Sequence, residues 1–341
     1  MNQLNSFFAS RKLLIAAFVL SYVHWVYLFF AVRMEIILDA LGWEFLANTI
    51  YKEGWTEFLV TGPHREPFYP FMISLSMRIA DCISVSYQSI QTIVQVFILL
   101  FTQFMVYKLL ARLKIRNFIT ALAVLYVGFS PVLVNSTFTL YCEIITCPFV
   151  LGAVFVSARS WKTLTGDEKY KDIFLLGMSL SVLFLILAFT RAVFLCVFPI
   201  LLSPFIVLAI VSLFKKRKEM FCKSSVFLLT SVLFFYLPVM SYKSANKKYN
   251  GQYAFTTRGS WALYGNTARR MDIMYPKRIL AGIATATGKG TCHYFFGEYE
   301  CEFWEPLLSD YFGKLKEEQL RGEGLSPDEI NSALVHLSKS P

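Results

Sequence analysis

The stretch Met34–Ala80, MEIILDALGWEFLANTIYKEGWTEFLVTGPHREPFYPFMISLSMRIA, decides how the rest of the chain is arranged. It collects charged and polar residues, whereas the sequence on either side of it is dominated by long apolar runs. Its second half continues into the segment 68–84, which is apolar but carries Arg78 and Asp81. Whether this segment crosses a membrane determines the side on which every later loop lies.

The composition is typical of a polytopic membrane protein. Of 341 residues, 56% are apolar and only 16% are charged, which is too apolar for an ordinary soluble domain. The formal net charge of +10 comes from short basic clusters between apolar runs, the arrangement that orients helices in a bilayer. We therefore expect an integral membrane protein that contacts membrane lipid and no nucleic acid.

Apolar segments of about 20 residues are long enough to cross the hydrocarbon core of a bilayer. The first such segment ends without a convincing cleavage site, so we expect it to stay as an anchor. The fold predicted is all-α, with about seven transmembrane helices and with interfacial helices in the first outer loop, 34–87. The expected spans are 13–32, 88–107, 117–136, 141–158, 173–190, 193–214 and 224–242.

The basic clusters discriminate between two topologies, which differ in whether segment 68–84 crosses the membrane. If 68–84 does not cross, every cluster that flanks a span lies in the cytoplasm, as the positive-inside rule requires. The clusters are Arg11/Lys12, Lys108/Arg112/Lys114/Arg116, Arg159/Lys162/Lys169/Lys171 and Lys215/Lys216/Arg217/Lys218/Lys223. We therefore predict that 68–84 is an amphipathic or re-entrant helix at the outer interface. Loop 34–87, the turns near 135–143 and 190–191, and the chain after Tyr242 then lie on the non-cytoplasmic side.

The sequence divides into a transmembrane part, 1–243, and a polar tail, 244–341. The tail is basic as far as residue 290 and then turns acidic, so its first half suits a phosphorylated lipid head; a solvated basic loop is the alternative. We expect Cys292 and Cys301, which lie in polar sequence outside the cytoplasm, to form a disulfide, with two free thiols as the alternative.

The sequence contains no arrangement of His, Cys and Asp with the spacing of a zinc site, because His24, His64, His293 and His336 are scattered. Segment 282–290 resembles a phosphate-binding loop, but it has one residue too many between its glycines and lacks Ser or Thr after the lysine. We expect no metal and no organic cofactor.

Short motifs follow one another along residues 25–270. They are DALGWEFLA from Asp39, HREPFYP from His64, FSP from Phe129, LYCE from Leu140, AFTR from Ala188 and GSWALYGNT from Gly259. In this order, and on one side of the membrane, they resemble the polyprenyl-phosphate-sugar glycosyltransferases of the C superfold, among them the protein O-mannosyltransferases and the lipid A aminoarabinose transferase. Members of that family continue into further spans, so we expect this chain to be a fragment or a degenerate copy.

The resemblance implies transfer of a sugar, with inversion, from a polyprenyl-phosphate donor to an acceptor glycan, lipid or protein. The site is expected on the outer side of a membrane, in this case the bacterial inner membrane. A carboxylate must deprotonate the acceptor, and the resemblance assigns this role to Asp39, with Glu35 or Glu44 as substitutes. A charge at a helix N-terminus is the alternative for Asp39.

Cations must stabilise the charge that develops on the leaving phosphate. The guanidinium fork matches phosphate oxygens, and for each candidate arginine a local salt bridge is the alternative. The candidates are Arg65, Arg191, Arg269 and Arg270. The expected substrate contacts are His64, Glu66, Tyr69 and Glu143.

Two of these contacts have a second interpretation. Glu143 is costly at the mouth of a span without a partner, so it either pairs with an arginine or binds sugar hydroxyls. Tyr69 is either an interface anchor or a platform for substrate.

A different class of function also fits the apolar spans and basic rim: a transporter or flippase of lipid-linked saccharides, which would not need a carboxylate base. A non-catalytic membrane scaffold is a third reading.

Overall fold

A computed structural model describes residues 11–34, 36, 39–62, 64–166, 168–257, 294–295, 320–327, 329–330 and 333. Over these residues the chain is built from helices, which confirms the predicted fold class of an all-α polytopic membrane protein. The main helices are α2 (Arg11–Ala31), α3 (Asp39–Lys52), α4 (Trp55–Thr61), α5 (Phe68–Ile83), α6 (Tyr87–Arg112), α7 (Asn117–Phe129), α8 (Pro131–Phe138), α9 (Glu143–Leu164), α10 (Tyr170–Thr190), α11 (Phe194–Phe214) and α12 (Lys218–Asn250).

Six of the described helices, α2, α6, α9, α10, α11 and α12, are long and apolar enough to cross a membrane. The pair α7 and α8 passes the same test together but is bent by 42°. Pro131 begins α8 and carries no amide hydrogen to continue the ladder of α7, which explains the break. The helix α5, with 16 residues, is too short to be one of the candidate spans, in keeping with the expected interfacial helix.

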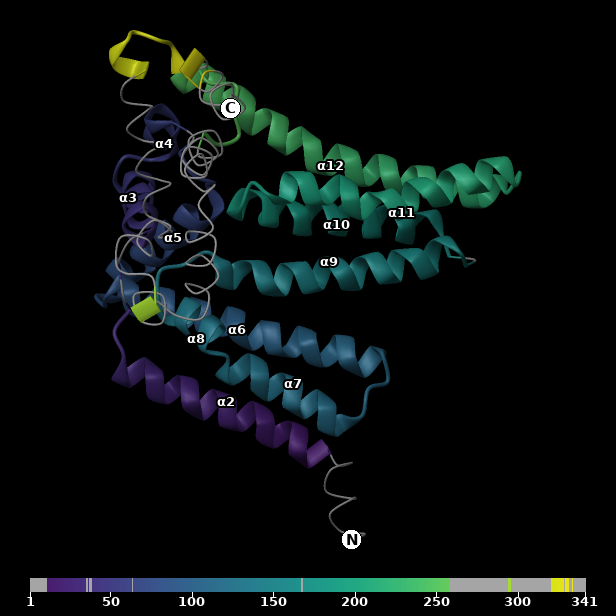
Figure 1. Cartoon of the computed structure of the whole chain (residues 1–341), viewed down its shortest axis with the longest axis horizontal. Coiled ribbons are helices and arrows are strands. Elements are labelled where there is room, and N and C mark those ends of the chain that lie inside the picture. The colour runs from purple at the N-terminus through teal and green to yellow at the C-terminus, as the bar shows by residue number, and fades with distance from the viewer. Residues whose placement is uncertain are drawn as a thin grey trace. The chain divides into compact units, whose positions relative to one another are not determined.

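The chain separates into two compact units. The first consists of Met1–Phe58 and Glu66–Ser241, and the second of Leu59–Arg65 and Tyr242–Pro341. The boundary predicted after residue 243 separates a transmembrane part from a polar tail. The division into compact units is of a different kind, so that boundary stays a prediction. In the first unit the long helices lie side by side, and α3 and α5 pack against each other at one end of them (Figure 1).

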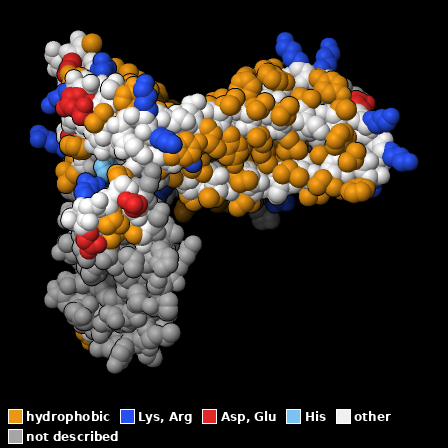
Figure 2. Space-filling model, turned by 90° about the horizontal axis from the view of Figure 1, so that it is seen from above, with side chains coloured by type: hydrophobic (Ala, Val, Ile, Leu, Met, Phe, Trp, Pro, Cys, Tyr) orange, Lys and Arg blue, Asp and Glu red, His pale blue; other side chains and the backbone are white. Residues whose placement is uncertain are grey.

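The loops that carry the basic clusters all lie at the other end of these long helices (Figure 1). They are the start of α2 and the turns α6–α7, α9–α10 and α11–α12. Hydrophobic side chains cover the sides of the helices between the two ends, and Lys and Arg side chains lie at both ends (Figure 2). An apolar girdle between two charged ends is the surface expected of a protein that spans a bilayer.

Buried polar side chains join α2, α6 and α7 in the apolar interior. The side-chain amide of Gln103 donates to Ser21 Oγ at 2.9 Å and to the carbonyl oxygen of Val124 at 2.8 Å. The indole N–H of Trp25 donates to the carbonyl oxygen of Gly128 at 2.8 Å. Gly128 allows this close approach, because a Cβ there would lie 2.6 Å from Ser21 Cβ. Hydrogen bonds of this kind hold helices together where no water competes.

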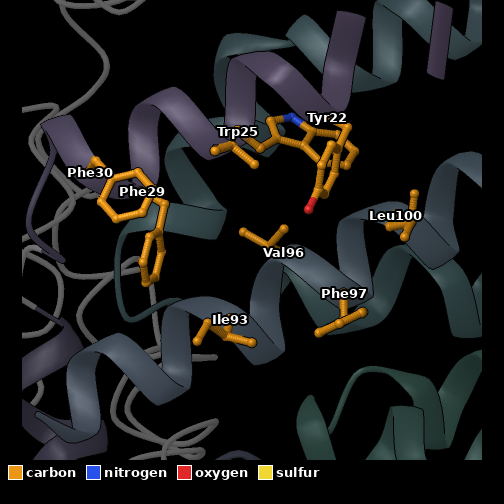
Figure 3. Close-up of a pocket in the computed structure, with 9 residues that line it drawn as sticks. Tyr22, Trp25, Phe29, Phe30, Ile93, Val96, Phe97 and Leu100 are labelled. Carbon is orange, nitrogen blue, oxygen red and sulfur yellow. The ribbon is translucent and has the colours of Figure 1, made fainter. Parts of the chain in front are cut away.

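Between α2 and α6 the packing leaves an apolar pocket of about 300 Å³. Tyr22, Trp25 and Phe29 line it from α2, and Ile93, Val96 and Phe97 line it from α6 (Figure 3). A second pocket between the same helices, of about 770 Å³, shares Phe97 and Leu100 with the first. The face of α6 toward α2 is therefore hollowed along much of its length.

Candidate functional site

A buried glutamine on α6 fixes the segment that leads into α9. Gln95 is fully buried, and its Nε2 lies 2.9, 3.0 and 2.8 Å from the carbonyl oxygens of Ser136, Thr137 and Thr139. Its Oε1 accepts a hydrogen bond from the Tyr69 hydroxyl at 3.2 Å. These carbonyls lie at the C-terminal end of α8, where a helix leaves carbonyl oxygens without partners of its own. One side chain therefore links α5, α6 and the end of α8.

The network continues along α6 toward its N-terminus. Gln91, one turn earlier and also fully buried, donates to Gln95 Oε1 at 2.9 Å and accepts from Ser76 Oγ at 2.8 Å. Because a buried amide without partners costs free energy, the two glutamines set how α5 rests on α6. The position of α5 in turn sets the position of the residues just before it.

Gln95→Leu should lower the free energy of unfolding by about 1–3 kcal/mol, because it leaves buried carbonyl oxygens without their donor. The measurement is thermal or denaturant unfolding of the purified protein in detergent. Gln88→Leu, on the same helix but only half-buried, is the matched control and should change stability by less than about 0.5 kcal/mol. Equal losses in the two variants would contradict this account of Gln95.

Tyr69, one of the predicted substrate contacts, is fully buried. Its ring packs edge-on against Trp43 of α3, with centroids 5.5 Å apart. Burial raises the pKa of Tyr69 well above its ordinary value, so the hydroxyl is neutral. The side chain thus serves to pack α3 against α5, and the two predicted roles, an interface anchor and a contact with substrate, stay predictions.

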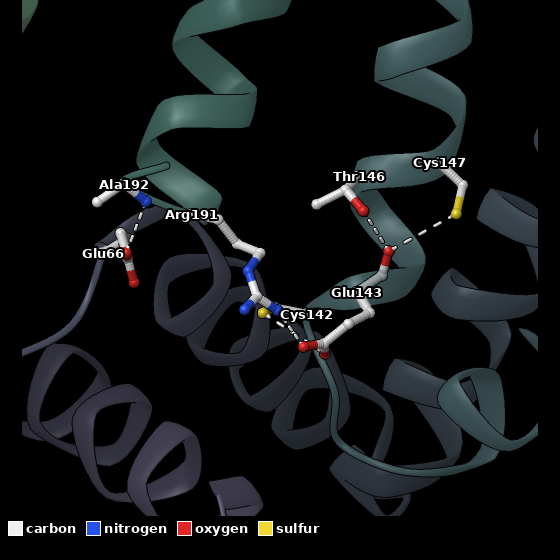
Figure 4. A network of polar contacts seen from close by, with 7 residues as sticks. All are labelled: Glu66, Cys142, Glu143, Thr146, Cys147, Arg191 and Ala192. Carbon is white, nitrogen blue, oxygen red and sulfur yellow. Dashed lines mark hydrogen bonds and ion pairs between the residues drawn. The ribbon is translucent and has the colours of Figure 1, made fainter. Parts of the chain in front are cut away.

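Three predicted site residues that are far apart in the sequence meet at the end of the helices that carries α3 and α5 (Figure 4). Arg191 Nη1 forms an ion pair with Glu143 Oε1. Glu66 Oε1 accepts a hydrogen bond from the backbone amide of Ala192 at 2.7 Å. The side chains of Arg191 and Glu143 are 47% and 51% exposed, while Glu66 is only 9% exposed. We call Glu66, Glu143 and Arg191 the charged cluster.

Helix ends place each member of the charged cluster. Glu143 is the first residue of α9, where the positive end of the helix dipole favours a carboxylate. Arg191 follows the last residue of α10 and has an extended backbone, with φ −149° and ψ 120°. Glu66 precedes Pro67, which disfavours a helical conformation for it. All three residues therefore lie at breaks between helices, and these breaks are at the same end of the long helices.

The environment of Arg191 keeps its guanidinium charged. Burial works to lower the pKa of Arg191, but the neighbouring Cys142 and the carboxylates of Glu143 and Glu66 outweigh it and raise the pKa above its ordinary value. Cys142 also contacts the far oxygen of Glu143, with Sγ 3.7 Å from Oε2. The charged cluster therefore contains the half-exposed guanidinium of Arg191, and the carboxylate of Glu143 that pairs with it is exposed to a similar extent.

The predicted bases both lie on α3. Asp39 is its first residue, a position that suits the helix-end alternative as well as a base. Glu44 accepts a hydrogen bond from the Tyr87 hydroxyl and thereby joins α3 to α6. Both carboxylates are half-buried. Their roles in catalysis stay predictions, as does that of Glu35, which lies outside the described residues.

His64 and Arg65 belong to the second unit. There the backbone amide of His64 donates to the carbonyl oxygen of Gly62 at 2.8 Å, and its own carbonyl oxygen accepts from Thr256 Oγ1 at 3.4 Å. The remaining predicted residues, Arg269, Arg270, Cys292 and Cys301, lie outside the described residues. Among the side chains that the structure does describe, no group of three or more His, Cys, Asp and Glu could hold a metal ion.

An apolar pocket of about 390 Å³ opens between α5, α6 and α9. Phe68, the first residue of α5, and Ile145, in the first turn of α9, line it, so the pocket reaches the same end of these helices as the charged cluster. Phe97 lines this pocket and also both pockets on the α2 side. The apolar hollows on the two sides of α6 thus meet at Phe97.

These features define an integral membrane protein of the all-α class, with a charged cluster at one end of its spans and apolar hollows leading away from it. Comparisons of the chain with protein-family models, with curated proteins and with solved structures find no match.

Proposed function

We propose that the protein transfers a sugar from a polyprenyl-phosphate donor to an acceptor glycan, lipid or protein. One observation carries the proposal: the half-exposed cation Arg191 and an apolar pocket that reaches the first turns of α5 and α9 lie at the same end of the long helices. A lipid phosphate combines an anionic head with a long apolar chain, so it needs a cation next to an apolar groove. The resemblance of the sequence motifs to polyprenyl-phosphate-sugar transferases supports the same reading.

The chemistry assigns a role to each part of the site. The bond between the anomeric carbon and the phosphate oxygen breaks, and its electron pair passes to the phosphate, whose charge Arg191 stabilises. The acceptor hydroxyl or amine attacks the anomeric carbon from the opposite face, which inverts it. The proton of the acceptor passes to a carboxylate, for which Asp39 is our candidate. The apolar pocket beside Phe68 holds the first part of the polyprenyl chain.

The positions of the basic loops support a proposal for the side of the membrane on which this reaction takes place. They lie at the end of the long helices away from α3 and α5, and basic loops favour the cytoplasmic side. The charged cluster, at the other end, then faces the non-cytoplasmic side, which we propose to be the outer face of a bacterial inner membrane. Lipid-linked sugars carried across the membrane would reach the site there.

Cysteine labelling tests the proposed sidedness. In a variant without the seven native cysteines, Glu53→Cys should react with a membrane-impermeant maleimide on intact cells, and Lys215→Cys only after permeabilisation. Both positions are exposed, so reactivity reports the side and not burial. Labelling of Lys215→Cys from outside would contradict the topology and, with it, the proposed location of the site.

The function is tested by incubating the purified protein with a panel of radiolabelled polyprenyl-phosphate sugars and with membrane extracts as a source of acceptor. We expect the label of one donor to move to a glycan, lipid or protein. Label that stays on its lipid with every donor would count against a transferase. Movement of the intact labelled lipid across reconstituted vesicles would favour a flippase instead.

A further inference from the structure

We propose that Glu143 is a specificity-determining residue, which competes with the phosphate of the lipid ligand for Arg191. This inference rests on the proposed function and adds to it a rule for which ligands are admitted. A ligand must carry enough negative charge to displace Glu143, so uncharged polyprenols and other neutral lipids gain nothing from Arg191.

The two carboxylates of the charged cluster are bound in different ways. Glu66 is nearly buried and bonds a backbone amide, that of Ala192, so it holds the turn that carries Arg191. Glu143 instead bonds the guanidinium itself and is half-exposed together with it. An exposed ion pair contributes little to stability because water screens it. The backbone of Arg191 therefore stays in place while its guanidinium can exchange one anion for another.

Displaced Glu143 keeps other favourable interactions. It is the first residue of α9, where the helix dipole favours a negative charge, and its Oε2 lies 3.7 Å from Cys142 Sγ. Its charge thus remains close to Arg191 after the exchange and repels the bound phosphate. This repulsion grows when the glycosyl bond breaks and the phosphate gains charge, which favours release of the spent lipid carrier.

Glu143→Gln separates this role from that of a residue which merely orients Arg191. The full chain is reconstituted in lipid nanodiscs, and binding of a short-chain polyprenyl phosphate and of the uncharged polyprenol of equal length is titrated. Removing the competing charge should lower the Kd for the phosphate by roughly two- to fivefold and leave the Kd for the polyprenol unchanged. Glu143→Asp, which keeps the charge, should bind the phosphate as the wild type does.

Glu53→Gln is the matched control, because Glu53 is an exposed carboxylate at the end of α3 and should leave both Kd values unchanged. A Kd for the phosphate that is unchanged or higher in Glu143→Gln would overturn the competition and show Glu143 to be an orienting residue. An equal gain for polyprenol would overturn it too. If the wild type binds the phosphate no better than the polyprenol, the proposed function fails, and this inference falls with it.

Discussion

Asp39→Asn is expected to lower the turnover of sugar transfer by about a hundredfold to ten-thousandfold, the usual contribution of a general base. Binding of the lipid phosphate should stay nearly intact, because a base is needed only when the acceptor attacks, whereas donor binding depends on Arg191 and the apolar pocket. The substitution keeps the size of the side chain and removes only its charge. Initial rates of label transfer and the Kd for polyprenyl phosphate, measured on the same preparation, separate the two effects.

The neighbouring carboxylate on α3 provides the control for Asp39. Glu44→Gln removes a charge from the same helix, but the bond from Tyr87 to Glu44 joins α3 to α6, so we expect this change to affect helix packing more than turnover. If Asp39→Asn keeps more than about a tenth of the activity, in place of the loss a general base predicts, then Asp39 is not the base and Glu44 becomes the next candidate. If Asp39, Glu44 and Glu143 all prove dispensable, the transferase reading itself fails.

Arg191→Ala should raise the Kd for the lipid phosphate roughly ten- to hundredfold, because hydrogen bonds to a charged group contribute about 1.5–3 kcal/mol each. Arg191→Lys keeps the charge but loses the fork that matches two phosphate oxygens, so its Kd should lie between those of the wild type and Arg191→Ala. Titration with polyprenyl phosphate in nanodiscs gives all three values.

Arg116→Ala serves as the control for Arg191, since Arg116 is an exposed arginine in the α6–α7 turn, at the end of the helices away from the charged cluster. It should leave the Kd unchanged. A similar loss in Arg116→Ala and Arg191→Ala would show that the ligand responds to the overall basic charge and not to a site. An unchanged Kd in Arg191→Ala would show that the phosphate does not bind at the charged cluster.

Hydropathy predicted the helical class and most spans, because an apolar run of membrane length has few other structures open to it. It placed helix ends poorly. The last predicted span, 224–242, is the apolar part of α12, which begins at Lys218 and ends at Asn250, because polar residues continue the helix at both ends. The predicted span 117–136 is divided at Ser130, because Pro131 begins a new helix there.

The charged cluster was partly predictable. Sidedness alone assigned Glu66, Glu143 and Arg191 to the same surface, and the cost of a charge at a span end called for a partner for Glu143. The bond from Glu66 to the Ala192 amide was not predictable, because it depends on how α5 packs against α10 across 126 positions of sequence. Gln95 was not among the predicted site residues, although glutamines one turn apart in an apolar run are a signal for buried hydrogen bonds.

The central claim is that the charged cluster holds the phosphate of a lipid-linked sugar and that the adjoining pocket holds its chain. Photo-crosslinking tests it most directly, with a polyprenyl phosphate that carries a photoreactive group on its first isoprene unit. Mass spectrometry of the crosslinked protein should find the label on the pocket segments Phe68–Met72 and Ile145–Phe149, and Arg191→Ala should reduce it. Labelling confined to other segments, or unaffected by Arg191→Ala, would contradict the account.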